Sequence, residues 1–99
     1  MQPNMKMIQQ MQNRLMKIQE ELSETIVEGT AGGGAVRVQV TGLRAVKGIK
    51  INPDAVDTED IEMLEDTILA AIQEAMTKAE ELAQQKMGIS GVNIPGLGF

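Results

Sequence analysis

The chain has 99 residues, a formal net charge of −5 and 42% hydrophobic residues, which is typical of one globular domain and not of a disordered chain. It contains neither Cys nor His, which excludes disulfides, thiolate chemistry and a histidine general base, and removes the usual zinc ligands. These absences disfavour most enzyme classes and leave carboxylate chemistry formally open, and the sequence indicates no cofactor and no small-molecule substrate.

The sequence shows no targeting or membrane segment. Its start is too polar for the apolar region of a secretory signal, and the longest unbroken apolar run, 68–72, is too short to cross a bilayer. We therefore expect a soluble cytoplasmic protein without a membrane partner.

A first long helix is predicted from about Pro3 to Glu24, because proline is favoured in the first turn of a helix. Its apolar residues alternate at spacings of three and four and fall within about 80° on a helical wheel; they are Ile8, Met11, Leu15, Ile18 and Leu22. A narrow stripe of this kind, over about two heptads, is typical of a helix that pairs with another helix.

The opposite side of this helix is polar and cationic. Five side chains fall within roughly 100° of one another, namely Lys6, Gln10, Asn13, Arg14 and Lys17. No acid interrupts them before Glu20. The pattern is compatible with an ordinary solvated face and with a face that contacts phosphates.

Between residues 25 and 51 the apolar pattern changes from helical spacing to alternation. Residues 25–29 can form a short strand, and 35–41 alternate cleanly with Val36, Val38 and Val40 on one face, which predicts a half-buried antiparallel strand. A turn at 42–44 leads to a third strand at 45–51, whose alternation slips near Gly48 and indicates a bulge. The Asn-Pro pair at 52–53 ends the predicted sheet.

The three glycines at 32–34 resemble a phosphate-binding loop only superficially. Such a loop needs a Lys followed by Ser or Thr at a fixed offset, and a helix after it. A predicted strand follows instead, so we expect a hairpin connection between the first two strands. The cations that follow the glycines either keep an exposed sheet face soluble and discourage edge pairing, or contact a polyanion; they are Arg37, Arg44, Lys47 and Lys50.

A second long helix is predicted from about Asp57 or Thr58, either of which can cap it, to about Met87, with Gly88 as its stop signal. It keeps one apolar face, made of Ile61, Leu64, Ile68, Ala71, Ile72, Ala75, Ala79 and Leu82. The glycine-rich remainder predicts a flexible tail, so the chain divides into one domain at 1–87 and a tail at 88–99.

The predicted order is α-β-β-β-α, an α+β fold with a three-stranded antiparallel sheet and two long helices. A second helix of about thirty residues spans about 45 Å, whereas a compact globule of this length is only about 34 Å across. That helix should overhang a monomer. Two apolar stripes and a sheet with open edges also call for a second chain, so we expect a homodimer.

Charge is divided unequally between the two halves of the chain. Residues 1–50 hold seven Lys or Arg and four Asp or Glu, a net +3, and residues 51–99 hold two and ten, a net −8. Such asymmetry is expected for a protein with a charged partner, and an acidic solvated face on the second helix explains it as well.

Nearly the whole chain, from about Met5, resembles the YbaB/EbfC family of bacterial nucleoid-associated proteins. The resemblance lies in the Met- and Gln-rich first helix, in VEGTAGGGAVRVQVTG at 27–42, VKGIKINPDAV at 46–56 and DIEMLEDTILAAIQEAMTKAEEL at 60–82, and in the Gly-rich tail. It implies a tweezer-like homodimer whose sheets meet at the centre while the long helices project. It also implies double-stranded DNA binding with low sequence specificity, a nucleoid location, a role in nucleoid organisation and gene regulation, and no catalytic residues.

The residues themselves fit DNA binding through phosphate contacts, because no helix-turn-helix, zinc finger or aromatic stacking platform is visible. The cationic face of the first helix is the first candidate for a DNA-binding surface, and the four sheet cations come second. Lys78 and Lys86 of the second helix come last, because acids surround them. The pI of about 4.6 differs from the pI above about 9 of a basic DNA-binding domain, so any basic surface has to be local.

Two alternatives remain. A dimeric protein-interaction scaffold of the same fold would use its acidic half and exposed methionines to hold a protein, with weak or no DNA binding. A metal enzyme would require six carboxylates to converge, although acids at the start of a helix also match its dipole; they are Asp57, Glu59, Asp60, Glu62, Glu65 and Asp66.

Overall fold

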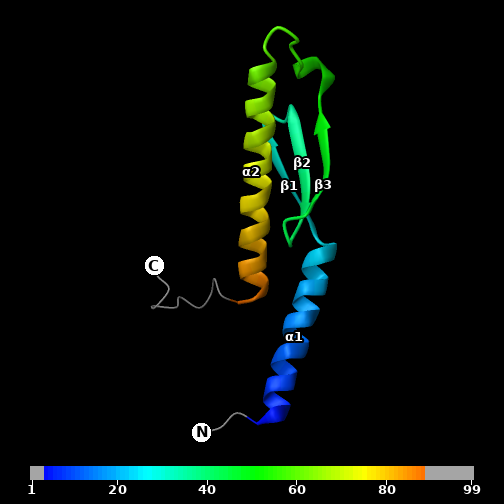
Figure 1. Ribbon diagram of the computed structural model, residues 1–99, viewed down its shortest axis with the longest axis vertical. Helices are drawn as coiled ribbons and strands as arrows, with labels where there is room; N and C mark the ends of the chain where they lie inside the picture. Colours follow the sequence, from blue (N-terminus) through cyan, green and yellow to red (C-terminus); the bar gives the residue numbers. More distant parts are fainter. Residues whose placement is uncertain (1–3, 89–99) are drawn as a thin grey trace, which may run out of the picture.

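The computed structural model describes residues 4–88, so Pro3 and residues 89–99 of the predicted tail lie outside the described residues. The elements follow one another as α1 (Met5–Glu24), β1 (Ile26–Ala31), β2 (Val36–Thr41), β3 (Val46–Ile51), a short 3-10 helix η1 (Pro53–Ala55) and α2 (Ile61–Lys86) (Figure 1). The strands form one antiparallel sheet in the order β1-β2-β3. The predicted α+β class and α-β-β-β-α order are thus confirmed.

The core lies between α2 and the β1–β2 half of the sheet. The alternation in β2 places Val36, Val38 and Val40 on the face toward α2, where all three are completely buried. Small side chains cover them from the helix, namely Ala71, Ala75 and Ala79. Because alanine side chains project only a short distance from a helix, α2 lies close against the strands.

The bulge predicted in the third strand is present opposite β2. Gln39 pairs with Gly48 but Val40 pairs with Val46, so Lys47 is the extra residue. The bulge restores the alternation, and Val46, Ile49 and Ile51 therefore lie on the same face as the buried valines of β2.

The hairpin between β1 and β2 passes through three successive glycines with positive φ angles, 65° at Gly32, 68° at Gly33 and 91° at Gly34. Other residues rarely adopt this region, which is the conformational reason for the glycine run. The predicted hairpin connection is confirmed.

The second helix begins later than predicted. Asp60, and neither Asp57 nor Thr58, caps it, since Asp60 Oδ1 accepts the N–H of Met63 at 3.2 Å. Asp57 closes a preceding turn, in which its Oδ1 accepts the N–H of Glu59 at 2.9 Å. Side chains of Asp and Thr compete for nearby backbone N–H groups, so Asp57, Thr58 and Asp60 offer three possible caps within four residues. The other end is as predicted, with Gly88 at a φ of 74° after the last helical residue.

The overhanging element is α1, which corrects the expectation that the second helix would extend beyond the globule. The described chain measures 67 × 29 × 16 Å, with a radius of gyration of 18.5 Å against about 13 Å for a compact domain of this length. Figure 1 shows α2 alongside the sheet and α1 extending away from it. The alanine stripe of α2 explains why this helix stays on the sheet.

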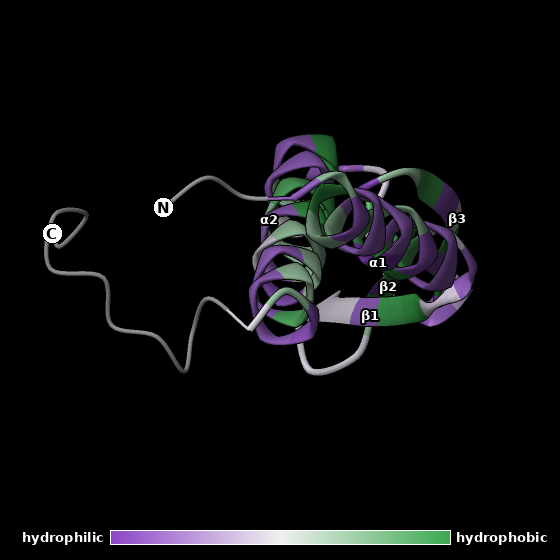
Figure 2. Ribbon diagram, turned by 90° about the horizontal axis from the view of Figure 1, so that it is seen from below, coloured by the Kyte–Doolittle hydropathy of each residue, from purple (hydrophilic) through white to green (hydrophobic). Residues whose placement is uncertain are grey.

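The packing leaves β3 uncovered. The helix contacts β1 and β2, and seen from below β3 lies farther from α2 than β1 does (Figure 2). Its three apolar side chains on the α2 side are therefore between 37% and 48% exposed.

Candidate nucleic-acid interface

The projecting helix α1 presents the cationic face that the sequence predicts. Asn4 starts the helix by accepting the N–H of Met7 on its Oδ1 at 2.7 Å. All five predicted side chains of this face, Lys6, Gln10, Asn13, Arg14 and Lys17, are exposed. Within residues 4–88 the ion pairs are Lys78–Glu74 and Lys86–Glu21, so the three cations of this face have no carboxylate partner there.

The apolar stripe of α1 is separate from its cationic face. Ile8, Met11 and Leu15 are between 42% and 62% exposed. The stripe is buried only at its base, where Leu22 packs against the β2–β3 turn and its carbonyl accepts the N–H of Gly42 at 2.9 Å. A partner can therefore cover the stripe without covering the cations.

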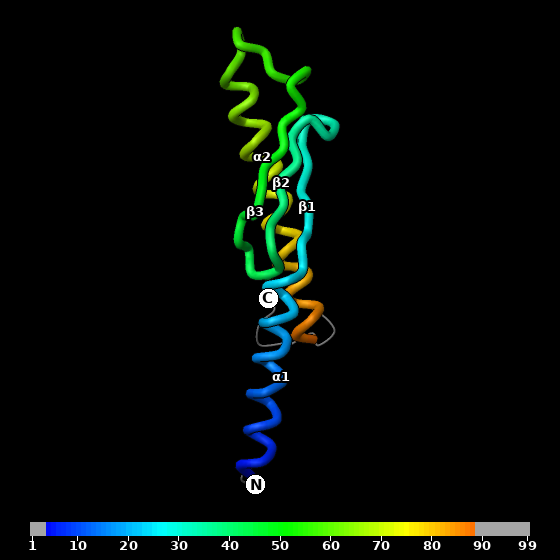
Figure 3. Tube along the Cα trace, turned by 90° about the vertical axis from the view of Figure 1, so that its right-hand side faces the viewer, coloured from blue at the N-terminus to red at the C-terminus, as the bar shows by residue number. Residues whose placement is uncertain are grey.

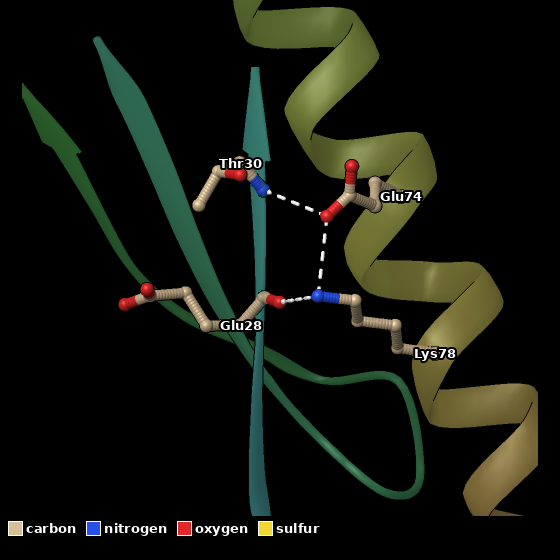
Figure 4. Close-up of polar contacts among 4 residues, drawn as sticks. All are labelled: Glu28, Thr30, Glu74 and Lys78. Carbon is tan, nitrogen blue, oxygen red and sulfur yellow. Dashed lines mark hydrogen bonds and ion pairs between the residues drawn. The ribbon is translucent and has the colours of Figure 1, made fainter. Parts of the chain in front are cut away.

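Lys78 is engaged at the edge of the sheet. Its Nζ lies 3.2 Å from Glu74 Oε1 and donates to the backbone carbonyl of Glu28 at 2.9 Å. Glu74 Oε1 also accepts the backbone N–H of Thr30 at 3.3 Å, so two side chains of α2 satisfy two backbone groups of β1 (Figure 4). The hydrogen bond from Thr30, followed by the one from Lys78, lowers the pKa of Glu74 below its usual value.

Lys86 is also engaged, because its Nζ lies 3.5 Å from Oε2 of Glu21 at the end of α1. The structure therefore places both predicted cations of α2 in contacts that fasten this helix to its neighbours. Sequence spacing cannot reveal this, since Glu28 and Glu21 lie fifty residues or more before their partners along the chain.

The four sheet cations are exposed but occupy different sites. Arg37 of β2 lies directly opposite Lys50 of β3 on the face away from α2, and Figure 3 shows that no helix covers this face. Lys47 lies in the bulge, and Arg44 lies in the β2–β3 turn with a positive φ of 66°.

The structure does not gather all predicted cations into one patch. β1 starts next to α1 and ends at the glycine hairpin, so Arg37 and Lys50 lie at the far end of the sheet from α1. The cationic region formed by Arg37 and Lys50 is therefore separate from the one on α1, whereas Arg44 lies in the turn beside the base of α1.

Within the described residues, no group of three or more Asp or Glu side chains is arranged to hold a metal ion, which includes the six acids of 57–66. No helix in this part of the chain combines the length and apolarity needed to cross a membrane.

The sequence profile of the YbaB/EbfC DNA-binding family matches residues 1–90. The chain belongs to this family. It is 54% identical over 83 residues to a nucleoid-associated protein of Chloroflexus aurantiacus, an alignment that covers 84% of this chain and 83% of that protein. It is 48% identical over 95 residues to a nucleoid-associated protein of Pelotomaculum thermopropionicum, covering 94% and 90%.

The same fold occurs in the crystal structure of an uncharacterized protein from Helicobacter pylori. The TM-score is 0.74 over 93% of this chain and 100% of that chain, with 19% sequence identity. The chain thus belongs to a DNA-binding family, and the relatives named above are nucleoid-associated proteins of bacteria.

Proposed function

We propose that this protein binds double-stranded DNA through phosphate contacts, with low sequence specificity, and that it contributes to nucleoid organisation and gene regulation at the nucleoid. The observation that supports this most is the open cationic face of α1, on a helix that extends away from the sheet. The proposed role is non-catalytic.

Low specificity follows from the chemistry of the face. Lys, Arg, Gln and Asn side chains readily contact phosphate oxygens, and such contacts position a protein on a duplex without reading its sequence. The sequence has one Phe and no Trp or Tyr, so stacking on unpaired bases contributes little.

A local basic surface makes the acidic net charge tolerable. The Debye length is about 8 Å at physiological ionic strength, so the acids of α2 are largely screened from a phosphate at the projecting end of α1. Within the proposed interface, Arg44 and Lys47 add weaker contacts, and Lys78 and Lys86 contribute least because each already holds a carboxylate.

We further propose that the protein acts as a homodimer. In a single chain, the apolar stripe of α1 and the apolar side chains of β3 remain exposed to solvent. A second copy supplies matching apolar surface that can bury them. Two copies also bring two cationic helices to one duplex, and such bivalence raises apparent affinity without any new type of contact.

The test measures binding of the purified protein to a random-sequence duplex by fluorescence anisotropy across a series of salt concentrations. The logarithm of the association constant should fall linearly with the logarithm of salt concentration, by about 0.9 for each phosphate neutralised. Lys6→Gln, Arg14→Gln and Lys17→Gln should each weaken binding and reduce this slope, by about 0.9 for each lost contact.

Gln12→Glu is the matched control. It changes the net charge by the same amount on the same helix, at an exposed position outside the cationic face, and should have a small effect. Absence of duplex binding by the folded wild-type protein at low salt would contradict the proposal and favour a protein partner. Equal weakening by the control would contradict the assignment of the face.

A further inference from the structure

The pairing of β2 with β3 forces two cations together on the outer face of the sheet. Arg37 and Lys50 occupy directly opposite positions in the antiparallel register, and the neighbour of Arg37 on the other side is the uncharged Thr30. Like charges at opposed positions destabilise a sheet, whereas opposite charges stabilise it. The pair therefore lowers the stability of the sheet, so folding stability does not explain its presence.

No carboxylate of the described residues forms an ion pair with either cation. The acid on the same face, Glu28, lies in the next row of the sheet, where its Oε2 accepts from Nε2 of Gln39 at 3.4 Å. Both cations are exposed and keep their donors for another partner.

The pair borders a cavity of about 300 Å³ that is lined by Gly34, Ala35, Arg37, Lys50, Ile51 and Asn52. A Cβ atom at Gly34 would lie 3.9 Å from a terminal nitrogen of Arg37, so the lack of a side chain there keeps this side of the guanidinium open. Asn52 Oδ1 accepts the N–H of Asp54 at 3.0 Å, which leaves the amide NH₂ group of Asn52 as a donor.

The lining therefore offers donors and positive charge and contains no carboxylate. The cavity beside the start of α2 has the opposite character, since Asp60, Glu62 and Asp66 line it. An oxyanion fits the first cavity chemically, because a guanidinium binds phosphate oxygens in bidentate fashion and an ammonium adds a compact point charge.

We propose that Arg37 and Lys50 together bind one phosphate group of the DNA backbone at this cavity, as a contact separate from the α1 face. This inference rests on the proposed function and adds a second, defined phosphate site to it. The apolar side chains of β3 face α2, so a partner chain that covers them leaves the phosphate site free.

Lys50→Glu distinguishes a binding role from a structural one. It replaces a like-charge pair with an opposite-charge pair across the strands, so the melting temperature should stay equal or rise. Duplex binding in the anisotropy experiment should weaken several-fold, and the salt slope should fall by about 0.9 for each lost phosphate contact. A merely structural role predicts that binding and stability change in the same direction.

Arg37→Gln and Lys50→Gln are compared with Gln73→Glu, which makes the same change in net charge at an exposed position of α2. The first two should reduce the salt slope and the third should not. Unchanged affinity and slope in both sheet variants, with normal binding by the wild type, would overturn the second site and leave the α1 interface standing.

A titration with inorganic phosphate tests the site without DNA. In ¹⁵N NMR spectra of the whole protein, the Arg37 side-chain Nε and the backbone amides of 34–37 should shift saturably, and Lys50→Gln should abolish these shifts. If the wild-type protein shows saturable shifts with phosphate but does not bind duplex, the site binds an oxyanion that is not a DNA phosphate. That result would overturn the proposed function as well. Absence of shifts would overturn the oxyanion site itself.

Discussion

Gly29 is the residue at which β1 and α2 approach most closely. A Cβ atom at this position would overlap the backbone nitrogen of Ala75 and the backbone oxygen of Ala71. Both are main-chain atoms of a long helix, so a side-chain rotation cannot remove the clash. The approach requires glycine on the strand and alanine on the helix at once.

Gly29→Ala should therefore destabilise the protein by about 1–3 kcal/mol or more, as overpacking does elsewhere. Urea denaturation at constant m-value measures this change. Gly48→Ala is the control, because its Cβ would meet only the flexible side chain of Gln39, at 3.2 Å; we expect a change within about 0.5 kcal/mol. A similar loss in both variants would contradict the close-packing argument.

Glu74 makes stability depend on pH. Because its pKa is lowered in the folded state, its contribution is fully present above the ordinary value of 4.5 and is lost as the pH falls through the lowered value. Glu74→Gln should thus be less stable than the wild type at about pH 6, and the difference should shrink toward about pH 3.

Denaturation at a series of pH values tests this expectation, with Glu65→Gln as a control at an exposed position of the same helix. A difference between wild type and Glu74→Gln that is the same at all these pH values would show that its hydrogen bonds do not depend on ionisation.

Elements with a long periodic pattern could be predicted from the sequence. The alternation of β2, the stripe of α1 and the apolar face of α2 are regular enough to predict the type of each element, and for β2 and α2 they also predict the buried side. The start of α2 could not be predicted, because Asp57, Thr58 and Asp60 can each cap a helix and the choice between them depends on the turn geometry.

Part of the candidate site could also be predicted. The exposed face of α1 follows from helical spacing alone. The opposition of Arg37 and Lys50 could not be predicted, because it depends on a strand register that the extra residue Lys47 shifts by one. The engagement of Lys78 with β1 could not be predicted either, since it joins residues fifty positions apart.

For the whole molecule, the projection of α1 beyond the sheet is the feature that most favours a partner chain. Most helical stability in proteins comes from packing of the apolar face, and within its own chain the stripe of α1 is fully buried only at Leu22. The proposed dimer supplies the missing contacts.

Light scattering across a concentration series should give twice the chain mass of 10.7 kDa. Leu15→Lys should shift the monomer–dimer equilibrium toward the monomer, because it places a charge in the apolar stripe of α1. Met16→Lys makes the same change at the next residue, which is 67% exposed and outside the stripe, and should have little effect. A wild-type protein of single-chain mass at every concentration would contradict the dimer.

For the proposed dimer, the contacts of Lys78 and Glu74 also bear on how many copies can join. They occupy outward backbone groups of β1, whereas among the described residues no side chain does the same for β3, the other edge strand. A sheet with two open edges can add chain after chain and grow into a fibre. If the proposed dimer joins edge to edge, it uses the open strand β3 of each copy, and the occupied groups of β1 disfavour further growth beyond the pair.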